Sequence, residues 1–383
     1  MPTIASVEVS VHSVPFDGVA VRQGVGNMIK RDLVLVRIRT DDGTEGIGEC
    51  HHGLNPTAVA EVVRHSMAGT LIGCDPHDME GIWARIYNHQ IRTHGLGAGS
   101  VIALSGIDIA LWDLRGKLLG QPVWKLLGGS KKRMRAYAGG MGLGWQPPET
   151  LVEEVGKYVG QGYTAVKLRI GDNVTDDRAR VMAVREAFPD LDIAVDAATR
   201  YVPTQLPELV ALAEDARVYW IEEPYAPDNL IAYAELRQAT RIPVAGGENH
   251  FLRQAFRDLF EARAIAIAQA DCTKAGGISE TKKIMEMAGA YHLLAAPHTS
   301  QSTISTSANV HLLCALPNAL IYEADISALN PWRDELASDG LQVVDGHIEP
   351  SDAPGLGLTL NEEVLARYPA IPGPCYVPPW WRG

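Results

Sequence analysis

The part of the chain after Gly129 repeats one pattern, in which a short apolar run is followed by an amphipathic helix. Strict alternation of strands and helices predicts a parallel sheet covered by helices, and eight units at intervals of roughly 20 to 30 residues favour a closed (β/α) barrel over an open doubly wound sheet. We therefore expect an α/β protein built on a barrel. The predicted strands are 134–138, 164–170, 192–196, 218–222, 242–246, 265–271, 292–296 and 319–323.

The chain before this repeat is organised differently. Residues 6–16 alternate in polarity, and residues 31–50 read as two strands around an Asp-Asp-Gly turn, which is a hairpin signal. Helical patterns follow at about 56–68 and 78–88. This order predicts a separate domain of mixed strands and helices.

Three domains follow from these patterns. We place the N-terminal domain at 1–129, the barrel at 130–326, and a Pro- and Gly-rich segment that returns to the N-terminal domain at 327–383. Two irregular pieces interrupt the N-terminal domain, at about 17–27 and 51–55.

The composition argues against several classes of function. The 383 residues fit a barrel of roughly 250 plus an extra domain, and 46% of them are hydrophobic. The net charge of −12 and the pI near 5.5 argue against nucleic-acid binding. We find no signal-peptide pattern and no apolar run approaching the ~20 residues of a membrane span. The five scattered cysteines favour a reducing compartment, so we expect a cytoplasmic protein that acts on a small molecule.

Four successive predicted strands end in an acidic residue. These residues are Asp196, Glu222, Glu248 and Asp271, at intervals of 26, 26 and 23, and His298 follows Asp271 by 27 residues. Because the carboxyl ends of barrel strands open at one mouth, we expect these side chains to meet there. Three converging carboxylates without a nearby ligand cysteine or histidine suit a hard cation, which predicts Mg²⁺.

Two cations lie on the second predicted barrel strand. Lys167 and Arg169 are two residues apart, so they point to the same face of an extended chain, and the apolar residues between and beside them point to the other face. Two positive charges on the inner face of a barrel predict an anion at the same mouth.

Taken together, these features resemble the enolase superfamily, specifically its mandelate racemase/muconate lactonizing enzyme branch. Residues 103–129, "ALSGIDIALWDLRGKLLGQPVWKLLGG", are similar to that family's N-terminal signature helix over its whole length. The barrel matches at the Lys-x-basic strand, the strand-end acids, the Asp–His pair and Glu323 in "IYEAD". The resemblance covers essentially the full chain. It implies an N-terminal α+β capping domain, a modified TIM barrel (β/α)₇β, one Mg²⁺ and abstraction of a proton α to a carboxylate.

The resemblance also implies a role for each residue. It makes His298 the acid or base, with Asp271 to orient it and raise its pKa, and it places Glu323 against the substrate carboxylate. Lys167 would contact the same carboxylate as proton loss turns it into a doubly charged enediolate, which cations stabilise. The implied metal ligands are Asp196, Glu222 and Glu248.

Two positions depart from the family pattern. The second barrel strand commonly reads Lys-x-Lys in family members with two bases, whereas Arg169 stands here. A guanidinium rarely deprotonates, so it is a poor base and a good carboxylate clamp. Ala198 stands where the family often has Asn. The departures disfavour a symmetric two-base racemase.

Substrate specificity is expected from loops of the capping domain over the barrel mouth. His51 and His52 in "ECHHGLN" and Arg92 and His94 in "RTHGLG" form a polar set that suits a polyhydroxylated acid.

Several functions remain open on the sequence alone. Our first choice is an acid-sugar dehydratase, a hydro-lyase that forms a 2-keto-3-deoxy acid, because one base that later acts as an acid suffices for this reaction. A cycloisomerase acting on a sugar-acid lactone or anhydro sugar acid shares the first half-reaction, and a racemase or epimerase comes third. A metal-dependent hydrolase would usually have histidine-rich metal ligands. A catalytically inactive ligand-binding barrel would have little reason to keep the Asp–His pair together with three metal acids. The resemblance also suggests a homo-oligomer, often an octamer. The sequence does not select the sugar acid or its stereochemistry.

Overall fold

The N-terminal part of the protein is built on a three-stranded antiparallel sheet. The structure is a computed structural model, and it describes residues 2–16, 24, 26–93, 95, 97–299 and 302–377. The sheet order is β1 (Ile4–Pro15), β3 (Lys30–Thr40), β4 (Glu45–Cys50). The N–H of Thr40 donates to the carbonyl of Thr44 across 3.0 Å, so the predicted hairpin turn is present.

Helices follow this sheet and differ from the prediction at their ends. The predicted helix at 56–68 begins as α1 (Pro56–Glu61) and continues as the wider π-helix η1 (Val62–Met67) and a 3₁₀ turn, η2 (Ala68–Thr70). The one predicted at 78–88 is α2 (Met79–Ile86) followed by a second π-helix, η3 (Tyr87–Ile91). No regular element covers residues 51–55, as predicted.

The signature stretch 103–129 is two helices, which corrects the prediction of one. The long helix α3 (Ala98–Leu119) ends where Gly120 takes a left-handed conformation with φ of 61°. Pro122 then caps the short α4 (Val123–Leu126). The glycine ends the first helix because it takes the left-handed conformation without strain, and the proline cannot continue it.

Helix α3 packs against β4 at backbone distance. A Cβ atom on Gly48 would collide with the carbonyl oxygen of Gly106, and one on Gly46 would collide with that of Ala110. Glycines at these positions let the helix and the strand approach this closely. The contact fixes the end of β4, from which residues 51–55 emerge.

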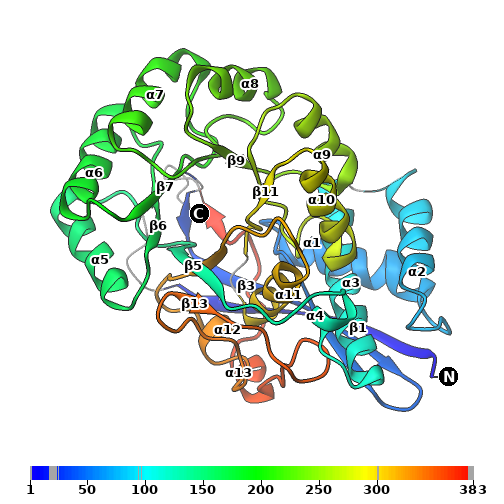
Figure 1. Ribbon diagram of the computed structural model, residues 1–383. Helices are drawn as coiled ribbons and strands as arrows, with labels where there is room; N and C mark the ends of the chain where they lie inside the picture. The colour runs from blue at the N-terminus through cyan, green and yellow to red at the C-terminus, as the bar shows by residue number, and fades with distance from the viewer. Residues whose placement is uncertain are drawn as a thin grey trace.

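The central part of the chain forms a parallel barrel (Figure 1). Its strands follow chain order from β5 to β11, and β12 pairs with β5 on the other side. A parallel bridge between Ala295 and Ala319 joins the final segment to β11, so the ladder returns on itself. The strands are β5 (Met134–Gly139), β6 (Ala165–Arg169), β7 (Asp192–Asp196), β8 (Ile221–Glu222), β9 (Val244–Gly246), β10 (Ile267–Ala268), β11 (Leu294–Ala295) and β12 (Tyr322–Asp325).

Helices alternate with these strands and ring the barrel (Figure 1). They are α5 (Pro148–Gly160), α6 (Val174–Ala187), α7 (Leu206–Asp215) preceded by the 3₁₀ turn η4 (Pro203–Gln205), α8 (Leu230–Ala239), α9 (Leu252–Glu261), α10 (Gly277–Ala290) and α11 (Thr303–Cys314). Seven β/α units followed by a last strand make the predicted modified TIM barrel (β/α)₇β with its N-terminal cap.

Several barrel strands are shorter than predicted. The run at 218–222 is regular only in β8, although the N–H of Tyr219 already donates to the carbonyl of Ile193 across 2.7 Å. The run at 265–271 is regular only in β10. The sequence reveals the whole apolar run, and this run is longer than the segment that forms regular strand pairs. Hydrogen bonds between neighbouring runs therefore extend beyond the regular ladder.

The C-terminal segment contacts both other parts of the protein. Its strand β13 (His347–Ile348) pairs antiparallel with β5, and β14 (Tyr376–Val377) pairs with β2 (Asn27–Met28). The N–H of Ser13 donates to the carbonyl of Tyr368 across 3.3 Å. Two short helices complete the segment, α12 (Pro331–Asp334) and α13 (Glu362–Arg367). The boundaries after residues 129 and 326 stay predictions.

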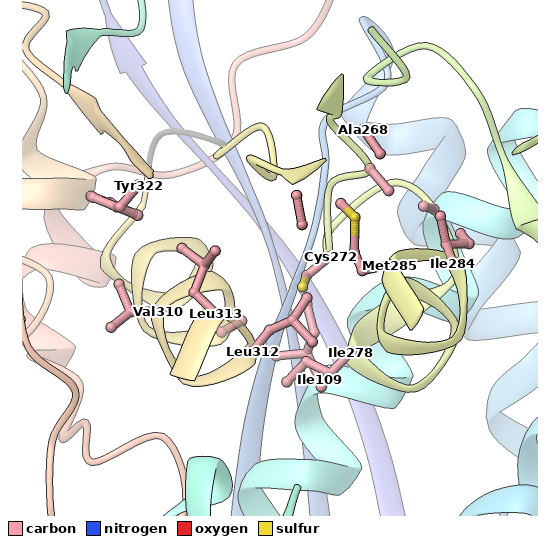
Figure 2. Close-up of a cluster of buried hydrophobic side chains, with 14 of the residues drawn as sticks. Ile109, Ala268, Cys272, Ile278, Ile284, Met285, Val310, Leu312, Leu313 and Tyr322 are labelled. Atoms are coloured by element: carbon pink, nitrogen blue, oxygen red, sulfur yellow. The ribbon is translucent and has the colours of Figure 1, made fainter. Parts of the chain in front are cut away.

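The capping domain and the barrel share one buried core. Figure 2 shows Ile109 of α3 beside Ile278 of α10 and Leu312 of α11, and all three side chains are fully buried. The cap therefore rests on the barrel wall formed by α10 and α11, next to the strands that carry Asp271 and His298. Within the described residues, no helix is both long and apolar enough to cross a membrane.

Candidate active site

The predicted acids and the histidine lie at the carboxyl ends of successive barrel strands. Asp196 and Glu222 are the last residues of β7 and β8, and Glu323 lies within β12. Glu248 and His298 follow β9 and β11 within three residues. Hydrogen bonds and ion pairs connect them, so the predicted set forms one site at the barrel mouth.

Lys167 on β6 holds three carboxylates together. Its fully buried Nζ lies 2.7 Å from Oε1 of Glu323 and 3.5 Å from Oδ2 of Asp196, and it also pairs with Glu222. Burial opposes the ammonium charge, but Glu222 and Glu323 outweigh it and raise the pKa of Lys167 well above its ordinary value. The lysine is therefore a fixed cation in this arrangement.

Arg169 lies beside Lys167 and points to the same side of the strand, as predicted. Its guanidinium pairs with Oδ2 of Asp196 and donates to the carbonyl of Gly140 after β5. Burial opposes ionisation of Asp196, but Arg169 and Lys167 lower the pKa of its carboxyl group. The other oxygen, Oδ1, accepts the backbone N–H of Ala198 across 2.8 Å.

Glu222 is held by two neutral donors that sequence reasoning missed. Its Oε2 accepts the indole Nε1–H of Trp220 at 3.1 Å and the amide Nε2–H of Gln269 at 2.7 Å, both from fully buried side chains. Its Oε1 faces Lys167. Burial raises the pKa of Glu222 to about 8, with Asp196 and Glu323 adding to the effect against Lys167. Nothing in the sequence around Trp220 and Gln269 marks them as partners of a strand-end acid.

Asp271 and His298 form the predicted pair. Oδ2 of Asp271 lies 2.7 Å from Nδ1 of His298, and its Oδ1 accepts both the N–H and the hydroxyl of Thr273, at 2.7 and 2.8 Å. Burial opposes ionisation of Asp271, but His298, Lys274 and the Thr273 N–H lower the pKa of its carboxyl group. The pair keeps the proton on Nδ1 and directs Nε2 away from Asp271.

Glu248 lies on the other side of the imidazole. Its Oε2 is 3.1 Å from Nε2 of His298. Burial disfavours the imidazolium, but Glu248, Glu323 and Asp271 together raise the pKa of His298 to about 9. The histidine is therefore protonated at neutral pH in this arrangement. Loss of the Glu248 contact would lower its pKa and free Nε2.

Glu323 closes the site from the last strand. Besides Lys167, it accepts the N–H of Thr299 at 3.1 Å and that of Gly140 at 3.3 Å. Burial opposes its ionisation, but Lys167 and His298 lower its pKa to about 2. The carboxylate is thus ionised and held against a buried cation.

The donor set at the mouth fits a divalent cation. Asp196, Glu222 and Glu248 offer only carboxylate oxygens, which are the ligands that a hard cation such as Mg²⁺ prefers. As the side chains lie, no group of three His, Cys, Asp or Glu residues in the described part of the chain is gathered closely enough to hold a metal ion. Lys167, Arg169 and His298 occupy the carboxylate oxygens instead.

The predicted specificity residues fall in different places. The N–H of His51 donates to the carbonyl of Thr273, next to the Asp–His pair, and His298 is among the charges that act on the His51 ring. His52 is buried, with its ring 5.9 Å from that of Tyr376 in the C-terminal segment. Arg92, just after η3, is exposed and donates to Asn88 of that helix across 3.4 Å. His94 lies outside the described residues, as do most of residues 17–27.

Two further buried carboxyl groups near the mouth were not predicted. Glu223 accepts the N–H groups of Gly247 and Asn249, at 3.4 and 3.3 Å, and the Asn249 side-chain amide at 2.6 Å. Glu49, at the end of β4 in the cap, contacts the start of α11. The pattern of acids at the ends of barrel strands could not reveal Glu49, because Glu49 reaches the site from the capping domain.

Comparison with known proteins gives the same picture. Residues 6–128 match the mandelate racemase / muconate lactonizing enzyme, N-terminal domain, and residues 150–364 match the enolase C-terminal domain-like family. D-galactarolactone cycloisomerase of Agrobacterium fabrum is 35% identical over 92% of this chain and 94% of that protein. Arabinonate dehydratase of Saccharolobus solfataricus is 33% identical over 88% of this chain and 90% of that protein.

Solved structures of similar fold cover nearly the whole chain. The crystal structure of a racemase from Streptomyces coelicolor A3(2) with bound magnesium matches with a TM-score of 0.86 at 28% identity, over 95% of this chain and 99% of that chain. With both halves of the chain matched, and with the barrel, cap and strand-end acids in place, the chain belongs to the mandelate racemase/muconate lactonizing enzyme branch of the enolase superfamily.

Proposed function

We propose that this protein is a Mg²⁺-dependent acid-sugar dehydratase. It removes the proton α to the carboxylate of a sugar acid and expels the β-hydroxyl as water, which leaves an enol that tautomerises to a 2-keto-3-deoxy acid. The observation that carries the proposal is the Asp271–His298 pair, at 2.7 Å, on the strand ends beside a set of carboxylates. Relatives that dehydrate sugar acids, such as arabinonate dehydratase, support it.

His298 has the geometry of an acid that also serves as a base. Asp271 holds Nδ1, so proton transfer takes place at Nε2. When Nε2 is free of Glu248, it takes the α-proton, and the resulting imidazolium returns that proton to the departing hydroxyl as the C–O bond breaks. Atoms balance in this sequence, because the acid loses one water and no oxidant is required.

The cations on β6 stabilise the negative charge that develops in the substrate. Lys167 is a permanent ammonium ion, and Arg169 is a fixed guanidinium that can bind a carboxylate with two hydrogen bonds. Arg169 takes the place that a second base would need. Proton transfer is therefore assigned to one side of the substrate, which favours elimination over racemisation.

The metal ligands in this proposal are Asp196, Glu222 and Glu248. When bound, Mg²⁺ supplies charge that stabilises the substrate carboxylate as the α-proton leaves. The excess of carboxylates at the mouth supports this assignment, as does the magnesium in the related racemase structure.

A cycloisomerase is the second candidate. In that reaction the same proton is removed, but the leaving group is the ring oxygen of a lactone or of an anhydro sugar acid. The similarity to D-galactarolactone cycloisomerase favours this alternative over a racemase or epimerase.

A substrate screen tests both candidates. The protein, loaded with Mg²⁺, is incubated with open mono- and diacid sugars and separately with their lactones, and 2-keto acid formation is measured. Turnover of open acids supports the dehydratase, and turnover restricted to lactones supports the cycloisomerase. Turnover that His298→Asn leaves intact would overturn both.

Location and assembly belong to the same proposal. The five cysteines are all unpaired, which supports a reducing, cytoplasmic compartment. We also propose a homo-oligomer, up to an octamer, with small-molecule carboxylates rather than nucleic acids or membranes as ligands. Light scattering of the purified protein measures the assembly directly.

A further inference from the structure

We propose that Glu49 of the capping domain is a positioning residue that holds the Asp271–His298 pair in its working geometry. The inference rests on the proposed function, because it concerns the acid–base pair of that site. It gives the cap a second task besides selecting the substrate.

Glu49 contacts the barrel at the helix that follows His298. Its carboxylate accepts the hydroxyl of Ser302 and, at 3.2 Å, the backbone N–H of Ser305. Ser302 is the N-cap of α11, and its hydroxyl oxygen in turn accepts the N–H of Ile304 at 3.0 Å. Glu49, Ser302 and Ser305 are all buried. The carboxylate therefore completes the cap of α11 from another domain.

The environment of Glu49 shows that this contact is not an ordinary surface ion pair. Both of its partners, the Ser302 hydroxyl and the Ser305 N–H, are neutral donors at the N-terminus of α11. Burial raises the pKa of the Glu49 carboxyl to about 8. A buried carboxyl with two directed hydrogen bonds is costly to replace, because its donors would be left unpaired.

The same end of β4 also contacts the loop that carries Asp271. The N–H of His51, two residues after Glu49, donates to the carbonyl of Thr273 across 3.1 Å. The N–H and hydroxyl of Thr273 hold Oδ1 of Asp271. Glu49 and His51 of the cap thus fasten the helix after β11 and the loop after β10.

One attachment holds the loop that carries Asp271, and the other holds the start of the helix that follows His298. Asp271 lies two residues before Thr273, and His298 lies four residues before Ser302. The 2.7 Å bond between the pair joins two separate strand-end loops, so its length depends on how those loops are held. The close packing of β4 on α3 gives the attachments a rigid base.

The test compares Glu49→Leu with Glu49→Gln in the full-length, Mg²⁺-loaded protein. Oε2 of Glu49 accepts both bonds, so leucine keeps most of the volume but removes this acceptor, whereas glutamine keeps an oxygen that can accept them. We expect Glu49→Leu to lower kcat by about 10²-fold, the typical cost of a misplaced catalytic group, with KM nearly unchanged. We expect Glu49→Gln to restore most of the activity. The substrate is the most active sugar acid from the screen.

The control is Asp113→Leu, which removes another buried carboxylate of the same domain. Asp113 pairs with Lys117 at 2.7 Å and accepts the N–H of Ile47 at 2.9 Å and that of Leu356 at 2.7 Å, and none of these partners belongs to residues 271–273 or 298–305. We expect it to lower the melting temperature without lowering kcat. An equal loss of kcat in both variants, or a loss in Glu49→Leu that appears only in KM, would overturn the inference.

Two measurements keep the inference testable if the substitution unfolds the protein or if no substrate is found. Ser302→Ala removes the hydroxyl donor from the barrel side, and we expect a smaller loss of kcat. Crystal structures need no substrate, and we expect the Asp271–His298 distance to exceed ~3.2 Å in Glu49→Leu or Ser302→Ala. An unchanged distance would refute the role of Glu49. Activity retained in His298→Asn would refute the proposed function instead.

Discussion

Nδ1 of His298 lies 2.7 Å from Oδ2 of Asp271, although 27 residues separate them. The two residues follow β10 and β11, which are paired in parallel. Because neighbouring parallel strands deliver their carboxyl ends to the same edge, this contact follows from the barrel itself. The proton transfers proposed for Nε2 of His298 depend on this contact.

Removal of the imidazole tests this contact directly. We expect His298→Asn to lower kcat by about 10²- to 10⁴-fold, because positioned acid–base groups contribute that much. Steady-state kinetics on the best sugar acid measure the effect. His347→Asn, on strand β13 far along the chain, is the matched control and keeps its activity. If His347→Asn also loses all activity, the loss in His298→Asn reflects impaired folding and not the missing imidazole.

Solvent exchange distinguishes one working base from two. We expect deuterium from D₂O to enter the α-position of only one C2 epimer of the substrate, because Arg169 holds its proton. NMR of the recovered sugar acid measures the exchange. Exchange into both epimers would show a second base and would contradict the assignment of His298 as the only one.

Magnesium is expected to stabilise the folded protein through the carboxylates. A ligand at 100 times its Kd adds about 2.7 kcal/mol to the free energy of unfolding, so the melting temperature should rise on addition of Mg²⁺. We expect the rise to disappear in Glu222→Gln and after chelation with EDTA. Calorimetry with and without the ion measures this. A rise of equal size in Glu222→Gln would place the ion elsewhere.

The contact between β4 and α3 sets the stability of the cap. A methyl group on Gly48 would collide with backbone atoms of Gly106 and Ala110, which cannot yield as a side chain can. We expect Gly48→Ala to lower the free energy of unfolding by at least about 1 to 3 kcal/mol. Gly69→Ala is the control, since no atom lies within 4 Å of a Cβ there. Urea denaturation followed by circular dichroism compares the two.

We expect Asp108 to make the stability of the protein depend on pH. Its buried side chain on α3 accepts the N–H of Ser279 at 2.9 Å, and burial raises its pKa to about 7 from 3.8. The folded state therefore binds a proton that the unfolded state has released, so this contribution to stability is lost as the pH rises from about 4 to 7.

The variant Asp108→Asn removes this titration. We expect the stability of the wild type relative to the variant to fall by roughly 1 to 4 kcal/mol between pH 4 and pH 8. Urea titrations at several pH values measure the difference. A difference that stays constant with pH would mean that Asp108 does not titrate in this range.

The sequence predicted the barrel and the strand-end acids because both follow from periodicity. Apolar runs mark the strands, and an acid at the same point of each run must reach the same mouth, so the positions of Glu222 and Asp271 follow from the order of residues alone. The end of α3 could also have been predicted from the sequence, since Gly120 and Pro122 are ordinary helix terminators. The π-helical turns after α1 and α2 carry no such signal.

The partners of these acids could not be predicted, because they depend on how the strands tilt across the barrel. Trp220 comes just before β8 and Gln269 just after β10, and only the closed barrel brings both to Oε2 of Glu222. Lys167 is predicted to contact substrate, yet in the structure its charge is shared among carboxylates of β7, β8 and β12. Glu49 was missed because the docking of the two domains leaves no trace in a local pattern.

The backbone contact of Gly48 with α3 has a consequence for engineering. It makes the end of β4 a fixed anchor, and residues 51–55 leave that anchor without regular structure of their own. Changes in this loop that keep the His51 N–H on the carbonyl of Thr273 and the buried His52 can therefore be made without rebuilding the domain beneath it. Grafting the corresponding loop of a relative onto this anchor, with Glu49 and the His51 N–H kept, would test whether substrate preference moves with the loop.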